Sequence, residues 1–305
     1  MVMRGRIPGR DWGLTWRMLF VMSLLSVLYL AFIAVLQALG VPWLFVGIIA
    51  GVMLFIQYFF SARMVLWSMG AKIVTPQEEP KLHAMVDRLV AQAGMPKPKV
   101  AIAESDVPNA FATGRNPKNS VVGVTAGIRR RLTDEELEGV LGHELTHVRS
   151  RDVMVITLAS FFATVASMLM QWLFWMGMFG GMGRRDREGG GSGAYLMLAY
   201  LASVVVYFVA TLLILALSRY REYAADRGGA ILTGLPSRLA SALSKISGAI
   251  ARIPTEDLRK VKGADAFFIV SALKGDSLAG LFSSHPPLHK RIERLRRLER
   301  ELEGF

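Results

Sequence analysis

Four long apolar stretches without a charged residue dominate the hydropathy pattern of the 305-residue chain. They cover Met18–Leu39, Val41–Ala62, Val153–Phe179 and Ala194–Leu217. A helix needs about 20 apolar residues to cross the hydrocarbon core of a bilayer, and each stretch reaches that length. The pattern therefore predicts about four transmembrane helices in two hairpins. Buried helices of a large soluble protein are the alternative, which four uninterrupted runs disfavour.

The basic residues concern the orientation of these helices. The net charge is +12, and four arginines precede the first apolar stretch. So basic a chain could bind nucleic acid, but this placement favours the positive-inside rule, so we expect no nucleic-acid partner. The positive-inside rule predicts an integral protein of the inner or plasma membrane with its polar segments in the cytoplasm. Three arginines in the connecting loop Gly180–Gly193 disagree with that scheme, which leaves two alternatives: a second hairpin that crosses fully, and one that re-enters.

The polar segments between and after the hairpins read as mixed α and β structure. We divide the chain into a first membrane hairpin (1–70), a first catalytic segment (71–152), a second hairpin (153–217) and a second catalytic segment (218–305). Helical spacing runs from Pro76 to Gly94 and again from Pro287 to about Glu303. Short β-rich runs bounded by Pro, Asn and Gly predict strands at Lys99–Ala103, Ala110–Thr113 and Ser120–Thr125.

A helix that begins at Thr133 carries the first candidate metal ligands. Thr133 and Glu136 have the spacing of a capping box. His143 and His147 are four residues apart, so they lie on one face of this helix and can chelate one tetrahedral zinc ion. The chain contains no cysteine, so any metal must be bound by His, Asp or Glu. Imidazole and carboxylate accept several divalent metals, and zinc is the one this spacing favours.

Glu144 lies between these histidines, within the apolar stripe of the same predicted helix. An ionised carboxylate there is costly unless a partner compensates it. Zinc lowers the pKa of a bound water to about 7, and Glu144 could then act as the general base and later protonate the leaving amine. The alternative is a chance match of five residues on an ordinary amphipathic helix, so a third ligand is needed.

The segment Ser218–Asp226 offers that ligand. On a helix, Ser218, Glu222 and Asp226 share a face, so Glu222 could complete a two-histidine, one-carboxylate site and Asp226 could orient a ligand histidine. The alternative is an exposed helix whose acids pair with neighbouring arginines. Because a membrane hairpin returns the chain to the side it left, Asp152 and Ser218 should emerge close together.

These motifs resemble those of the HtpX-like membrane metallopeptidases, a family related to the CAAX prenyl proteases. The resemblance covers nearly the whole chain, and four segments carry it in the same order: Asn109–Gly114, His143–His147, Ser218–Asp226 and His285–Pro287. The resemblance implies one Zn2+ per chain, bound by His143, His147 and Glu222, with Glu144 as the catalytic residue.

The resemblance also suggests substrate contacts. Asn109, Ala110, Phe111 and Ala112 would form an edge strand that pairs with the substrate backbone, and Asn109 could hold a substrate carbonyl; a plain surface turn is the alternative. His285 looks like the later histidine that hydrogen-bonds the oxyanion in related zinc peptidases, although it could also be only a helix-entry residue.

Two further histidines, His83 and His289, lie on polar helices, and we expect both at the surface.

The fold predicted is therefore an α-helical membrane protein with a zincin-like α+β catalytic domain. The function predicted is zinc-dependent hydrolysis of internal peptide bonds. The resemblance, and not the composition, implies that the substrates are membrane or misfolded proteins, as in protein quality control and the stress response. Its partners would be polypeptide substrates and the lipid bilayer. A prenyl-protein protease is the first alternative, disfavoured by only four spans and no evident large chamber in the membrane. A non-catalytic adaptor is the second, disfavoured by the retained Glu144.

Overall fold

The computed structural model describes residues 11–41, 43–180, 192–253 and 283–304. The chain forms two compact units, each built from separate segments. Residues 15–57 and 155–217 form the helical unit, whereas residues 1–14, 58–154 and 218–305 form the second unit, here called the catalytic unit. The arginines at positions 4, 6 and 10 and most of the connecting loop (181–191) lie outside the described residues.

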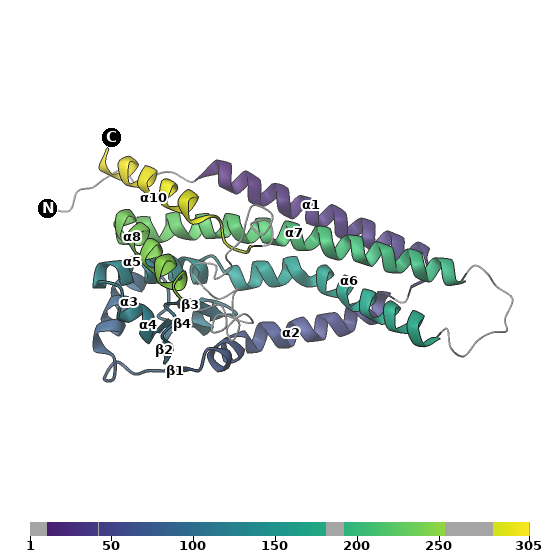
Figure 1. Cartoon of the computed structure of the whole chain (residues 1–305), viewed down its shortest axis with the longest axis horizontal. Coiled ribbons are helices and arrows are strands. Elements are labelled where there is room, and N and C mark those ends of the chain that lie inside the picture. Colours follow the sequence, from purple (N-terminus) through teal and green to yellow (C-terminus); the bar gives the residue numbers. More distant parts are fainter. Residues whose placement is uncertain (1–10, 42, 181–191, 254–282, 305) are drawn as a thin grey trace. The chain divides into compact units, whose positions relative to one another are not determined.

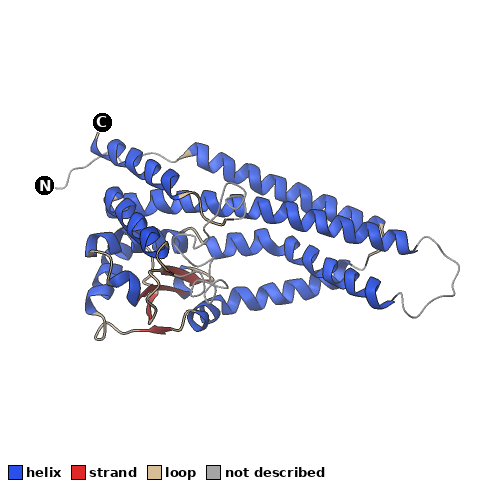
Figure 2. Cartoon of the chain, viewed as in Figure 1, coloured by secondary structure: helices blue, strands red, loops and turns tan. Residues whose placement is uncertain are grey.

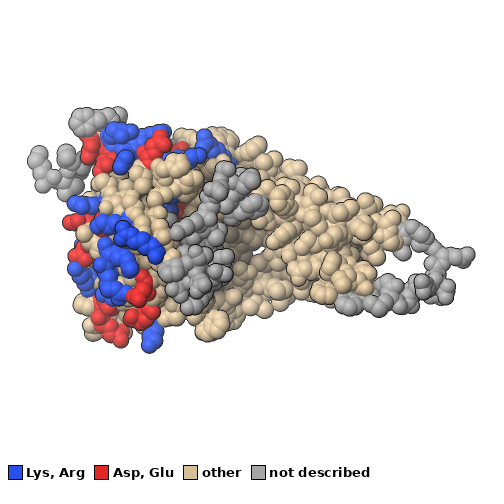
Figure 3. All heavy atoms as spheres, viewed as in Figure 1, with Lys and Arg blue, Asp and Glu red and all other residues tan. Residues whose placement is uncertain are grey.

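The helical unit is made from four long helices, which confirm the four predicted spans (Figure 1). They are α1 (Trp12–Ala38), α2 (Trp43–Ser68), α6 (Asp152–Gly180) and α7 (Ser192–Thr233). The start of α1, the end of α2, the start of α6 and the end of α7 belong to the catalytic unit. Tyr29 of α1 packs on Phe162 of α6 at 4.7 Å between ring centroids, and its hydroxyl donates to the Ala159 carbonyl. Among the described residues of this unit Arg17 is the one charged side chain, so its surface is almost free of charge (Figure 3). Large apolar side chains lie exposed on this unit, as suits a lipid-facing surface.

A four-stranded sheet forms one layer of the catalytic unit (Figure 2). Its strands are β1 (Ala71–Ile73), β2 (Lys99–Ala103), β3 (Ala110–Gly114) and β4 (Ser120–Thr125), in the order β1-β2-β4-β3. The pair β2–β4 is parallel and the other two pairs are antiparallel. The three predicted strands are confirmed, and β3 lies at an edge. The sequence missed β1, because three residues are too few to show an alternating pattern.

Helices complete this unit: α3 (Pro80–Ala93), the short α4 (Ala126–Arg129), α5 (Asp134–Arg149), α8 (Pro236–Ile250) and α10 (Leu288–Glu303), with a 3-10 turn at Pro117–Asn119. The first predicted helix begins at Pro80, four residues later than expected. The Glu78 carboxylate accepts hydrogen bonds from the Thr75 amide and hydroxyl, which closes a separate turn, and proline suits the first position of a helix. The helix ends at Gly94 in the left-handed conformation, as its glycine predicts.

One continuous core joins the sheet to α3, α5, α8 and α10. Its fully buried members include Val86, Leu89, Val124, Leu145, Leu239 and Leu243. His83 also lies in this interior at 7% exposure, with Nε2 3.0 Å from the Val74 carbonyl oxygen. The prediction that His83 is a surface residue was therefore wrong, because its position on α3 faces the sheet rather than solvent. His289 is exposed, as predicted.

Candidate metal centre and active site

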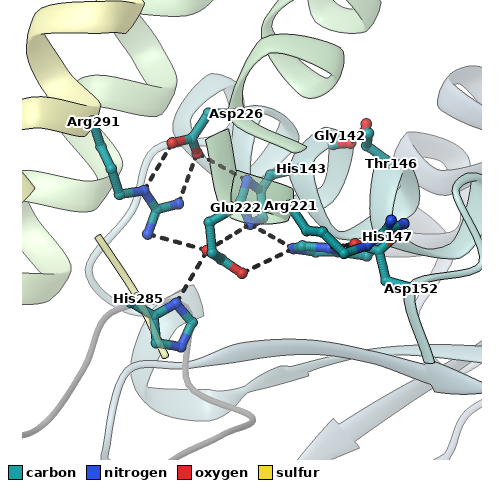
Figure 4. A network of polar contacts seen from close by, with 10 residues as sticks. All are labelled: Gly142, His143, Thr146, His147, Asp152, Arg221, Glu222, Asp226, His285 and Arg291. Carbon is teal, nitrogen blue, oxygen red and sulfur yellow. Dashed lines mark hydrogen bonds and ion pairs between the residues drawn. The ribbon is translucent and has the colours of Figure 1, made fainter. Parts of the chain in front are cut away.

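Helix α5 positions both candidate histidine ligands. Its capping box is complete: Thr133 accepts from the Glu136 amide, and the Glu136 carboxylate accepts from the Thr133 amide. The two imidazoles project from adjacent turns, with 3.1 Å between their Nε2 atoms (Figure 4). His143 is 1% exposed, so its ring is held in the interior of the catalytic unit.

Glu222 reaches the same point from α7. This helix continues without a break from the fourth apolar stretch through Glu222 to Thr233. The Glu222 Oε2 atom lies 3.7 Å from His143 Nε2, and Oε1 lies 3.3 Å from His147 Nε2. The buried Oε2 atom accepts no hydrogen bond from the described residues. Ligands about 2.1 Å from a tetrahedral zinc ion are roughly 3.4 Å apart, so this donor set fits that ion.

Two adjacent glycines allow α7 to approach α5 this closely. A Cβ atom added at Gly229 would lie 2.5 Å from the His143 amide nitrogen, and one at Gly228 would lie 2.5 Å from the Thr146 methyl group. A side chain at either position would therefore separate the helix that carries Glu222 from the helix that carries the histidines.

Each candidate histidine has its own carboxylate on the second ring nitrogen. His143 Nδ1 lies 3.0 Å from Asp226 Oδ1, the relation the sequence predicted for Asp226. His147 Nδ1 lies 2.7 Å from Asp152 Oδ2, a partner that sequence reasoning missed. Such carboxylates fix the tautomer and the orientation of a metal-binding imidazole. Arg221 pairs with Asp152 and donates to the Ser150 carbonyl. These contacts bring the segment Ser218–Asp226 to Asp152, in line with the expectation that Asp152 and Ser218 emerge close together.

Arg291 of α10 is a second residue that the sequence reading missed. It is 1% exposed, donates from Nε and Nη2 to both Asp226 oxygens at 2.8 and 2.7 Å, and lies 3.5 Å from Glu222 Oε2 (Figure 4). Burial lowers the pKa of a guanidinium, but the Asp226 carboxylate outweighs burial and holds the Arg291 pKa above its ordinary value. The signal in the sequence was its position: Arg291 lies on the same helical stripe as Leu295 and Leu298.

Glu144 is buried beside the two histidines at 5% exposure. Burial raises the pKa of its carboxyl group above the ordinary value, and the neighbouring His143 and His147 only partly oppose this effect. Burial lowers the pKa of His147, but the Glu222 carboxylate reverses the direction, so the net shift is upward. A carboxyl group whose pKa lies closer to neutrality is suited to accept and return a proton.

His285 also reaches this cluster. It is 8% exposed, and its Nδ1 atom lies 3.1 Å from Glu222 Oε2 (Figure 4). Its Nε2 atom is buried and makes no hydrogen bond with the described residues. His285 therefore has one ring nitrogen directed at Glu222 and the other available to a ligand.

The edge strand β3 lies beside α5, and its side chains support the unit. Asn109 is completely buried, and its backbone exchanges hydrogen bonds with Thr125. The Phe111 ring fills the space where Gly123 has no side chain. Within the described sheet β3 pairs only with β4, so its other backbone edge can pair with a peptide. Contacts of the Asn109 side chain with substrate remain a prediction.

Comparisons with known proteins agree with this geometry. The model of peptidase family M48 matches residues 76–299. A protease HtpX homolog from Moorella thermoacetica is 59% identical over 97% of both chains. Protease HtpX homolog 2 from Methanosarcina acetivorans is 52% identical, over 96% of this chain and 98% of that one. These matches confirm the predicted resemblance.

The crystal structure of Ste24p from S. mikatae has a similar fold. Its TM-score is 0.56 at 15% identity, and the match covers 88% of this chain and 62% of Ste24p. At that identity the likeness concerns the fold alone. Together with the four apolar helices, the sequence matches lead to one conclusion: the chain belongs to peptidase family M48 and is a membrane-embedded metalloprotease.

Proposed function

We propose that this protein is a zinc-dependent endopeptidase with one Zn2+ bound by His143, His147 and Glu222. One observation carries the proposal: ligand atoms of these three residues, from two separate segments of the chain, all lie within 4.8 Å of one another. The carboxylates behind the two imidazoles support it, because metal-binding histidines usually have such partners.

The chain's own residues can then perform peptide hydrolysis. Zinc, when bound, supplies a Lewis acid that makes water nucleophilic near neutral pH. Glu144 takes the proton from the attacking water and delivers it to the leaving amine. His285 donates from Nε2 to the oxyanion that develops at the scissile carbonyl. Strand β3 holds the substrate backbone in an extended conformation through its free edge.

The proposal extends to substrates and location. We infer that the substrates are membrane or misfolded proteins, since binding to a strand edge requires an extended peptide. The catalytic domain would consist of residues 71–152 and 218–305, two segments that each follow one of the two membrane hairpins in the sequence. It would face the cytoplasm from the inner or plasma membrane. The basic N-terminal segment supports that orientation.

Two variants test the proposal with separate readouts. Glu144→Gln should abolish cleavage of an unfolded protein such as casein and still bind about one zinc per chain, because the ligands remain. Glu222→Ala should lose both zinc and activity. Zinc content by elemental analysis and cleavage by gel assay distinguish them. Undiminished cleavage by Glu144→Gln would contradict the general-base role, and parental zinc content in Glu222→Ala would exclude the ligand role.

A further inference from the structure

A small pocket borders the proposed metal site, between the end of β3 and the end of α5. The pocket is shallow and partly open to solvent, and its lining includes Ala112–Gly114 on β3, His147 on α5, and Arg151 just beyond the end of α5. Because the pocket adjoins both a metal ligand and the substrate-pairing strand, a peptide held along β3 would place one of its side chains there. The pocket thus has the position of a specificity site.

Arg151 has an unusual backbone conformation at this pocket. Its φ angle is +54°, and it is the one non-glycine residue with positive φ in the described part of the chain. Such a conformation is unfavourable for a long side chain, and outliers of this kind concentrate at binding and catalytic sites. The conformation follows directly from the tight exit from α5, where the Arg151 amide donates to the Val148 carbonyl.

Arg151 is an exposed residue, and its side chain forms no ion pair with a described residue. The neighbouring carboxylate, Asp152, is already engaged on both oxygens, by His147 and by Arg221. No other acidic residue lines the pocket. The formal charges of Arg151 and Asp152 cancel, but Asp152 is paired with Arg221. The guanidinium of Arg151 is therefore the cation left unpaired, and it has the chemistry to bind a carboxylate.

We propose that Arg151 gives the enzyme a preference for substrates with an acidic side chain, Asp or Glu, at the residue that enters this pocket. The proposal rests on the proposed function, since it assumes a peptide bound along β3. Side chains alternate along an extended peptide, so only one position near the scissile bond should enter the pocket and its two neighbours should not.

A peptide series on the purified full-length enzyme tests this without any mutation. A quenched fluorescent peptide that the enzyme cleaves is varied one position at a time to Glu, Gln or Lys, in a neutral detergent. At one position kcat/KM should be roughly fivefold higher for Glu than for Gln, and lowest for Lys, as expected for a partly exposed ion pair. The preference should shrink as the salt concentration rises.

Variants then assign the preference to this residue. Arg151→Asn removes the charge and keeps a side chain that tolerates positive φ, so it should abolish the preference for Glu. Arg151→Lys should restore most of it. Arg149→Gln removes a neighbouring exposed arginine outside the pocket and should leave the preference unchanged.

Three outcomes would overturn the proposal while leaving the proposed function intact, since the parent peptide is still cleaved with zinc. One is equal kcat/KM for Glu and Gln at every position. Another is a similar preference at all positions, which indicates diffuse attraction rather than a pocket. The third is an effect of Arg151→Asn that appears only in anionic lipid and does not depend on peptide charge, which assigns Arg151 to lipid headgroups. If the parent enzyme cleaved none of the peptides, that result would instead count against the proposed function.

Discussion

Replacing Gly229 with alanine would add a single methyl group at the contact between α5 and α7. That methyl carbon would lie 2.5 Å from the His143 amide nitrogen and 2.8 Å from both the His143 Cα and the Gly142 carbonyl carbon. All three atoms belong to the backbone, so no flexible side chain can move aside. Ordinary van der Waals contact requires about 3.4 Å or more, so the two helices would have to separate by roughly 0.9 Å.

A separation of that size should cost both stability and metal affinity. Overpacking of a close contact typically costs about 1–3 kcal/mol of folding free energy. Ligand distances at a metal site tolerate only about 0.2 Å, so withdrawal of Glu222 from the histidines should weaken zinc binding by roughly tenfold or more. Thermal unfolding in detergent measures the first effect, and competition with a chromophoric chelator measures the second.

Gly248 provides a matched control on α8. It is an exposed helical glycine with nothing within 4 Å of an added Cβ atom. Gly248→Ala should therefore stabilise the protein by about 0.5–1 kcal/mol, since alanine favours the helix, and should leave zinc affinity unchanged. Parental zinc affinity and unfolding temperature in Gly229→Ala would refute the argument that this close approach builds the site.

Three further predictions concern the surroundings of the site. Arg291→Gln should destabilise the protein by about 3–5 kcal/mol, because it leaves the Asp226 carboxylate buried without its cation, and Arg291→Lys should recover only part of the loss by thermal unfolding. Burial raises the pKa of Glu136, but hydrogen bonds from Lys245 and Ser241 outweigh burial and hold this pKa below its ordinary value. The ionised Glu136 should therefore stabilise the fold above about pH 4.3, and this contribution should be lost as the pH falls further. Glu136→Gln should accordingly be less stable than the parent by roughly 1–2 kcal/mol at pH 7 and equally stable in acid. Single cysteines at positions 105 and 237 should be protected from a membrane-impermeant thiol reagent on intact cells. Labelling of only one of them would place the two catalytic segments on opposite sides of the membrane. Labelling of a cysteine at position 192 would mean that the second hairpin crosses the membrane.

The features that the sequence predicted well are those encoded within a short window. Long apolar runs predict the four helices of the helical unit, and short β-rich runs bounded by Pro, Asn and Gly predict three of the four strands. The capping box sets the start of α5, and the spacing of His143 and His147 follows from the period of a helix. Glu222 and Asp226 could be found because they lie one helical turn apart within the recognisable motif Ser218–Asp226.

The features that were missed depend on contacts between distant segments. Asp152 lies at the boundary of an apolar stretch, where its charge reads as a helix cap rather than as a partner of His147. Arg291 belongs to a highly charged helix. It shares a helical stripe with Leu295 and Leu298, but only the packing of α10 shows that its guanidinium binds Asp226. His83 was placed at the surface because the polarity of its neighbours was given more weight than its position on the buried face of α3.

The formal charges around the site give an independent argument for a divalent cation. Among the described residues, four carboxylates gather there, from Glu144, Asp152, Glu222 and Asp226, together with two guanidinium groups from Arg221 and Arg291. With His143 and His147 neutral, as metal ligands must be, these six groups sum to two negative charges in a largely buried volume, which is unfavourable unless they are compensated. A single divalent ion at the point where His143, His147 and Glu222 converge would bring that sum to zero. The arginines therefore neutralise the carboxylates that orient the histidines, and the remaining two negative charges match the charge of the metal that the donor geometry fits.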